Sequence, residues 1–190
     1  MELSARTDKA GLIGMAGAAI WFLSLILEYA LGLQPPAGAG PLYVANQLLA
    51  FLGLAGVAYG WLGILWGKGV RGRFGKVAVW MFTLGYTLII LAGIIALFTH
   101  SDNNPIFILL PLGGLLIDLG ALLTGILVVT AKQWSGWPRF MPLIYALILW
   151  LVIESPFILD IYPDGPGFVP ETVQAIGLFF VGLAVFRTSD

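Results

Sequence analysis

The sequence contains no cysteine, which excludes disulfides, thiolate metal sites, iron–sulfur clusters and thiol nucleophiles. Charge is also scarce, because 10% of the 190 residues are charged, whereas an ordinary soluble domain has roughly a quarter. Nine basic residues against ten acidic ones give a net charge of −1. Since no basic excess remains to neutralise phosphates, we do not expect a nucleic-acid partner.

Several kinds of chemistry lack the residues that they need. His100 is the single histidine, so it cannot supply two axial ligands to a haem. The lysines beyond the N-terminus, Lys68, Lys76 and Lys132, lie at the ends of apolar runs, where they cannot form a buried retinal Schiff base. Nucleophile-elbow, phosphate-loop and His-Glu-x-x-His motifs are absent as well. The sequence therefore does not favour an enzyme, predicts no metal site and leaves any cofactor unidentified.

Apolar residues, in contrast, dominate the chain, at 59% of the sequence with a mean hydropathy of +0.97. They form six runs, at residues 10–33, 41–67, 77–98, 105–131, 140–159 and 170–186. About twenty helical residues cross a bilayer core, so five runs are long enough and the last is short. The runs show no alternation of apolar and polar residues, which argues against a membrane barrel. We predict an all-α integral membrane protein, a six-transmembrane-helix bundle forming one domain over residues 1–190.

The basic residues predict the orientation of this bundle. They fall at the N-terminus, in the connections after the second and fourth runs, and at the C-terminus, namely at Arg6, Lys9, Lys68, Arg71, Arg73, Lys76, Lys132, Arg139 and Arg187. Six crossings place these four regions on one side, which the positive-inside rule makes cytoplasmic. We predict a multi-pass protein of the cell (inner) membrane with both termini in the cytoplasm.

Three carboxylates lie inside apolar runs, at Glu28, Asp118 and Glu154, and no basic residue accompanies them there. A charge at membrane depth costs about 2.5 to 3.5 kcal/mol even on lenient scales, so such groups face protein or water. Each acid can stay protonated, hydrogen-bond to neutral donors or hold a cation. Asp118 lies nearest the middle of its run, on a face with small residues, and is expected to face protein. Pro156 leaves the carbonyl of Val152 unbonded beside Glu154, which predicts a kinked, polar pocket.

Small residues also line one face of the second run, at Gly53, Gly56, Gly60 and Gly63. Glycines at this spacing permit close helix crossings. We expect them to pack within the chain; a homodimer interface is the alternative.

Polar and aromatic side chains gather in the half of the runs opposite the basic regions. The polar ones are Glu28, Asn46, Gln47, His100, Glu154, Asp160 and Gln174. An apolar cavity with a few polar groups at its mouth is typical of small-molecule sites. The predicted cavity faces the outer leaflet, and its expected ligand contacts are Glu28, Glu154, Trp21, Trp150, Tyr29, Asn46 and His100.

Three functions are consistent with these features. The first is binding of a hydrophobic or amphipathic ligand, such as a lipid, quinone or pigment, in the predicted cavity. The second is proton- or cation-coupled transport of a small molecule, in which Asp118 and Glu154 load and release the ion. The third is an accessory subunit of a larger membrane complex. The expected partners are thus membrane lipids, a hydrophobic small molecule, and a second copy or a larger membrane complex.

Overall fold

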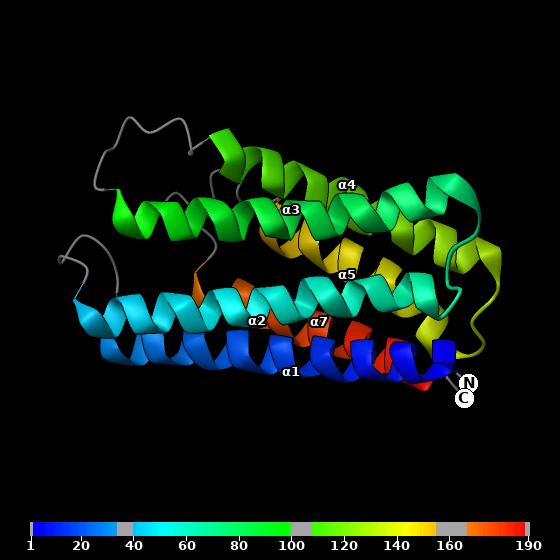
Figure 1. Ribbon diagram of the computed structural model, residues 1–190, viewed down its shortest axis with the longest axis horizontal. Helices are drawn as coiled ribbons and strands as arrows, with labels where there is room; N and C mark the ends of the chain where they lie inside the picture. Colours follow the sequence, from blue (N-terminus) through cyan, green and yellow to red (C-terminus); the bar gives the residue numbers. More distant parts are fainter. Residues whose placement is uncertain (1, 34–39, 100–107, 155–166, 189–190) are drawn as a thin grey trace.

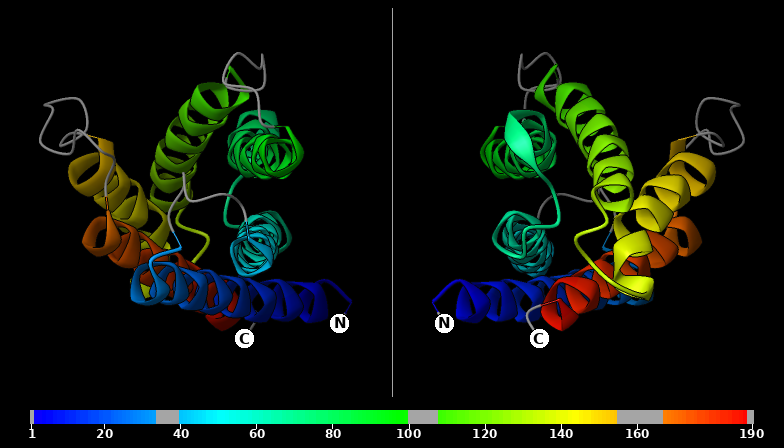
Figure 2. Two further views of the ribbon diagram at one scale, coloured as in Figure 1. Left: turned by 90° about the vertical axis from the view of Figure 1, so that its left-hand side faces the viewer. Right: turned by 90° about the vertical axis from the view of Figure 1, so that its right-hand side faces the viewer.

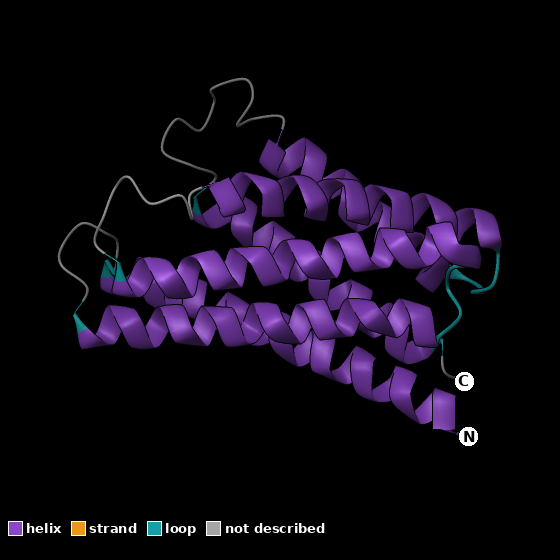
Figure 3. Ribbon diagram, turned by 45° about the horizontal axis from the view of Figure 1, so that its top comes forward, coloured by secondary structure: helices purple, strands orange, loops and turns teal. Residues whose placement is uncertain are grey.

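The computed structural model describes residues 2–33, 40–99, 108–154 and 167–188, and these residues contain helices but no strand (Figure 3). Six helical spans are long and apolar enough to cross a membrane. Their elements are α1 (Glu2–Leu31), α2 (Pro41–Trp66), α3 (Gly72–Phe98), α4 (Leu109–Ala131), a span made of the 3₁₀-helix η2 (Trp137–Phe140), α5 (Met141–Ile148) and the π-helix η3 (Leu149–Glu154), and finally α7 (Phe168–Arg187).

The helix bounds differ from the apolar runs in a consistent way. α1 and α3 begin earlier than predicted. The residues before the apolar runs include Ala5, Lys9 and Lys76, and alanine and lysine have helix propensities as high as those of apolar residues. The prediction that the last run is too short is wrong. α7 has 20 residues because it continues through Phe168 and Arg187, and it reaches about 30 Å.

The fifth span is irregular upstream of the predicted kink. Its regular turns end at Ile148, and Leu149–Glu154 form a π-helix. Pro156 lies outside the described residues, so the predicted kink at that proline stays a prediction. Single π turns inside helices occur frequently at functional sites. Glu154, the last residue of η3, thus belongs to a segment whose backbone departs from the regular helix.

The six spans form a closed ring. Each packs against the next in chain order, from α1 through α2, α3, α4 and α5 to α7, and α7 returns to α1. The closest associations are α1 with α2 and α7, and α3 with α4. Figure 1 shows the helices side by side, and the end views in Figure 2 show α7 next to α1 at the lower side of the bundle. Residues far apart in the sequence therefore meet inside the ring.

Glycines allow α1 and α2 to approach backbone to backbone. A Cβ atom at Gly17 would lie 2.6 Å from the carbonyl oxygen of Gly53, and one at Gly56 would lie 2.9 Å from the Cα of Gly17. Gly60 lies against Gly14 in the same helix contact, which we call the α1–α2 seam. Gly63 instead lies against Val185 of α7. The glycine face of α2 is thus occupied by helices of the same chain.

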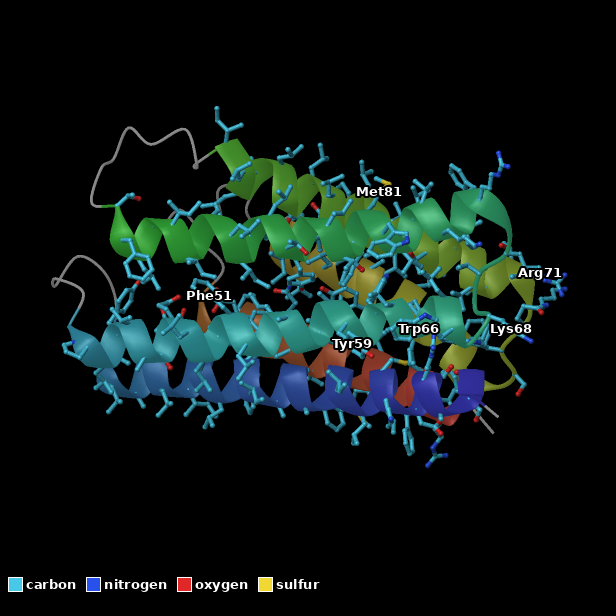
Figure 4. All side chains as sticks on the ribbon, in the orientation of Figure 1. Phe51, Tyr59, Trp66, Lys68, Arg71 and Met81 are labelled. Carbon is cyan, nitrogen blue, oxygen red and sulfur yellow. The ribbon has the colours of Figure 1, made fainter. Side chains whose placement is uncertain are left out.

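Both chain ends and the connections after α2 and α4 lie at one end of the bundle, which we call the basic end (Figure 1). Lys68 and Arg71 project there in Figure 4. The indole of Trp134 donates a hydrogen bond of 2.8 Å to the carbonyl of Gly67, and Arg71 donates one of 2.8 Å to the side chain of Gln133. These two bonds join the α2–α3 and α4–α5 connections.

Candidate functional site

Two tyrosine hydroxyls meet inside the ring. Tyr86 of α3 and Tyr145 of α5 are fully or almost fully buried, and their hydroxyl oxygens lie 3.3 Å apart. The amide of Gln174 on α7 donates a hydrogen bond of 3.4 Å to the Tyr145 hydroxyl. Since buried hydroxyls are costly unless they are paired, this contact stabilises the meeting of three helices.

One carboxyl group lies within electrostatic range of these hydroxyls, and a second lies within range of the first. Asp118 of α4 is only 8% exposed, as its small-residue face predicts. It interacts electrostatically with Glu154 of η3 and with both tyrosines. No hydrogen bond joins the Asp118 carboxyl to another residue in the described ranges. We call Tyr86, Tyr145, Gln174, Asp118 and Glu154 the central cluster.

Aromatic rings form the wall of the central cluster. Trp61 of α2 stacks on Phe82 of α3, with ring centroids 3.7 Å apart and an angle of 16° between the planes. Both rings meet Tyr145 edge on, at 5.7 Å and 6.1 Å. Offset stacking and edge-to-face contacts are the favoured geometries of aromatic pairs. This wall separates the polar groups from α1.

The indole nitrogen of Trp61 has no hydrogen-bond partner although the side chain is buried. Trp61 also borders a cavity of about 10 Å³, whose other walls are Gly14, Val57, Gly60, Leu178, Val181 and Gly182. A space of this size holds about one water molecule. It is too small for an amphipathic ligand, and it lies on the side of Trp61 that faces α1 and α7.

A second group of polar residues lies at the end of the bundle opposite the basic end. Gln47 of α2 donates a hydrogen bond of 3.5 Å to the carboxylate of Glu28 on α1. Glu28 also interacts electrostatically with Glu171 of α7. Tyr29 and Tyr43 lie within electrostatic range of Glu28, and the ring of Tyr29 packs 5.0 Å from that of Phe168. We call Glu28, Gln47, Glu171, Tyr29 and Tyr43 the distal cluster.

Asn46 ties the distal cluster to the α1–α2 seam. Its side chain is 4% exposed, and its amide donates a hydrogen bond of 3.2 Å to the carbonyl of Ser24. Among the residues that the structure describes, the amide oxygen of Asn46 has no hydrogen-bond partner. Ser24 precedes Glu28 by one helical turn, so the amide is bonded to α1 one turn before the carboxylate.

The structure divides the ligand contacts predicted from the sequence. Glu28 and Tyr29 belong to the distal cluster, Asn46 bonds to Ser24 one helical turn away on α1, and Glu154 belongs to the central cluster. Trp21 lies in the α1–α2 seam against Gly53, and the indole nitrogen of Trp150 is buried without a partner. His100 and Asp160 lie outside the described residues, so their predicted part in a ligand cavity is untested.

Sequence reasoning missed three residues of these clusters. Tyr86 lies in the middle of the third apolar run and Tyr145 near the start of the fifth, and a tyrosine without a nearby polar motif gives no sign that it is fully buried. Glu171 is the second residue of the last run, so its position alone indicates an acid at the boundary of the span and not a group inside the bundle. The signal that could have found it is its spacing, because Glu171 and Gln174 are three residues apart and share a face of α7.

Within the described ranges, no group of three or more His, Asp or Glu side chains could hold a metal ion. The two carboxyls of the central cluster, Asp118 and Glu154, can take up a proton or a weakly held monovalent cation. Comparison with known proteins adds no family: no family model, curated protein or solved structure matches the chain.

Proposed function

We propose that this chain is a multi-pass protein of the cell membrane, with both termini and the basic connections in the cytoplasm. The six apolar helices support insertion, and large apolar side chains such as Phe98, Ile108 and Leu151 are exposed on the bundle. Lipid would cover these side chains. The gathering of Lys68, Arg71 and both termini at one end supports the orientation through the positive-inside rule.

Within this frame, we propose that the protein is a proton- or cation-coupled transporter of a small molecule, with Asp118 and Glu154 as the coupling groups. One observation carries the proposal: the buried carboxyl of Asp118 and the partly exposed carboxyl of Glu154 lie within electrostatic range of each other on different helices, and no described basic residue pairs with either of them. Two negative charges repel strongly where the dielectric constant is low. Binding a proton or a cation removes this repulsion, so occupancy of the pair would depend on the ion supply.

The groups around Asp118 and Glu154 allow a proton or cation to bind to the two carboxyls and to leave them. Tyr86 and Tyr145 can reorient their hydroxyls, so each can donate to a carboxylate or accept from a carboxylic acid. Glu154 ends the π-helix η3, where the backbone has left the regular hydrogen-bonding pattern. A small shift of η3 would change the distance between Glu154 and Asp118 without disturbing α4. Loading and release of the ion can therefore be linked to movement of one segment.

Infrared difference spectroscopy of the purified protein tests the coupling groups without knowledge of the substrate. A change of pH or of sodium concentration should alter a carboxyl band in the wild-type spectrum. Asp118→Asn should remove this band, and Glu154→Gln should shift or remove it. The matched control is Asp8→Asn, which replaces a carboxyl near the basic end and should leave the band intact. A wild-type spectrum in which no buried carboxyl responds to protons or sodium would overturn the assignment.

Transport itself is tested in proteoliposomes with an imposed proton or sodium gradient. Uptake of at least one solute from a panel of labelled amines, carboxylic acids and sugars should require the gradient. Asp118→Asn should abolish this uptake while the protein still folds. Gradient-driven uptake that persists in Asp118→Asn would remove the coupling role of this residue.

A second candidate function is binding of an amphipathic ligand at the distal cluster, open toward the outer leaflet. The observation that favours it is that Glu28, Gln47 and Glu171 come from three helices: Gln47 bonds to Glu28, and Glu171 lies within electrostatic range of Glu28. Native mass spectrometry of mildly extracted protein should then show a retained small molecule that is lost in Glu28→Gln. An unliganded mass in the wild type would count against this function and would not affect the coupling proposal.

The third interpretation, an accessory subunit docked through the glycine face of α2, gains no support, because α1 and α7 occupy that face.

A further inference from the structure

The connection between α2 and α3 and the first turns of α3 carry four positive charges without an acidic partner in the described ranges. Lys68, Arg71, Arg73 and Lys76 are exposed, and none forms an ion pair with a carboxylate in the described ranges. Arg71 uses one of its five N–H donors on Gln133, which fixes its guanidinium and leaves the others available. The surface where α3 begins can therefore donate several charge-assisted hydrogen bonds to an anion.

The connection that carries this charge is held in place. A Cβ atom at Gly69 would lie 2.9 Å from the Trp134 indole, so the ring lies directly on this glycine. The same indole donates its hydrogen bond to the Gly67 carbonyl, so it holds this turn at two points. Arg71 and the start of α3 thus have a defined position relative to the α4–α5 connection, and an anion would meet a prepared surface.

An exposed apolar strip continues from the charged residues along α3. Phe74 is 63% exposed, and Val77, Trp80 and Leu84 follow it as exposed side chains. The spacing of three or four residues places them on one face of the helix. From Arg73 to Leu84 the helix rises about 16 Å, which is close to the depth of one leaflet of a bilayer core.

We propose that the beginning of α3 binds an anionic phospholipid: Arg71, Arg73 and Lys76 hold its phosphate headgroup, and an acyl chain lies along Phe74, Val77, Trp80 and Leu84. The charge selects an anion, and the adjoining apolar strip selects a lipid over a soluble phosphate. The inference rests on the proposed membrane insertion, but it does not depend on ion coupling at Asp118 and Glu154.

Lipid titration followed by native mass spectrometry tests the site. The probes are phosphatidylglycerol and phosphatidylcholine with the same acyl chains, added to delipidated protein. The wild type should retain phosphatidylglycerol in preference to phosphatidylcholine. Arg73→Gln combined with Lys76→Gln should weaken phosphatidylglycerol binding about tenfold or more and leave phosphatidylcholine binding unchanged.

A control with the same loss of charge separates a defined site from general attraction to the basic end. Lys9→Gln combined with Arg187→Gln removes two exposed positive charges at that end, from α1 and α7. This control should bind phosphatidylglycerol as the wild type does. An equal loss in both double variants would overturn the site, as would a wild type without preference for the anionic lipid.

Two further measurements test the lipid assignment. Inorganic phosphate added at the lipid concentration should not displace phosphatidylglycerol, and complete displacement would overturn the assignment to a lipid. Trp80→Ser should weaken retention of the long-chain lipid and leave the binding of a water-soluble glycerophosphate unchanged. A chain that does not remain in the membrane fraction would instead contradict the proposed insertion. Failure of the insertion proposal can therefore be distinguished from failure of the lipid site.

Discussion

Tyr145 shows what a single buried hydroxyl contributes to this molecule. Its side chain is 0% exposed, and its oxygen meets both the Tyr86 hydroxyl and the Gln174 amide. Three helices are joined at this one atom, and α4 separates the first of them, α3, from α5 and α7 in the chain. In an apolar interior such contacts are specific, because few other partners are available to these groups.

Tyr145→Phe should therefore destabilise the protein, although it removes only one oxygen. The Gln174 amide and the Tyr86 hydroxyl would each lose a partner, at a cost of about 1 to 3 kcal/mol in the free energy of unfolding. Reversible unfolding in mixed micelles measures this change. Tyr59→Phe is the control, since Tyr59 is exposed, and it should change stability by less than about 0.5 kcal/mol. Equal effects of the two changes would show that the hydroxyl contact is not stabilising.

At the scale of single residues, the sequence predicts the acids better than their partners. Asp118 is conspicuous because a carboxylate is rare in an apolar run, and its small neighbours correctly predict burial. Tyr86 and Tyr145 give no such signal, because tyrosine is also enriched at membrane interfaces, so its presence in an apolar run does not indicate burial. The separation of Glu28 from Glu154 was also not predictable, since similar depth in two helices does not determine which neighbours they face.

The α1–α2 pair is the element in which sequence and structure agree most closely. Gly14, Gly17 and Ser24 share one face of α1, and the structure places this face against Gly60, Gly53 and Asn46 of α2. Residues spaced by three and four are enough to identify such a face. They do not identify the partner helix, which depends on the packing of the whole ring.

Gly17→Ala should separate these two helices. The added methyl group would lie 2.6 Å from the Gly53 carbonyl oxygen, and neither backbone can move away without breaking the seam. Overpacking of this kind costs about 1 to 3 kcal/mol, measurable as a lower unfolding midpoint.

Gly114→Ala provides the matched control for this prediction. A Cβ atom at Gly114 meets nothing within 4 Å, and alanine is the better helix former, so stability should stay the same or rise by up to about 1 kcal/mol. If both variants lost the same stability, the effect would come from helix propensity and not from the seam.

For the whole molecule, the sequence predicts six spans and the end at which its basic residues lie, but not the order of neighbours around the ring. The helices are apolar on most of their surface, so no hydrophobic face indicates which helix lies beside which. Only the seams with glycine or polar residues carry such information, and these are short. The closing contact between α7 and α1 joins the two ends of the described chain and has no local signal.

Labelling with a membrane-impermeant maleimide tests the orientation, and the absence of cysteine makes the natural chain a ready background. Ser135→Cys lies in the exposed α4–α5 connection at the basic end, and Gly40→Cys lies at the opposite end before α2. In intact cells Gly40→Cys should react, whereas Ser135→Cys should react only after the membrane is permeabilised. The reverse pattern would invert the proposed topology.

The position of α7 in the ring has a consequence for biosynthesis. This helix leaves the ribosome after the other five, yet it inserts between α5 and α1 and brings Glu171 and Gln174 to their partners. Until α7 arrives, Tyr145 lacks its amide donor and the glycine at position 63 lacks its cover by Val185. The nascent bundle is thus open between α5 and α1 until α7 inserts, and a chaperone or membrane protease can recognise a chain that lacks α7 by this gap alone.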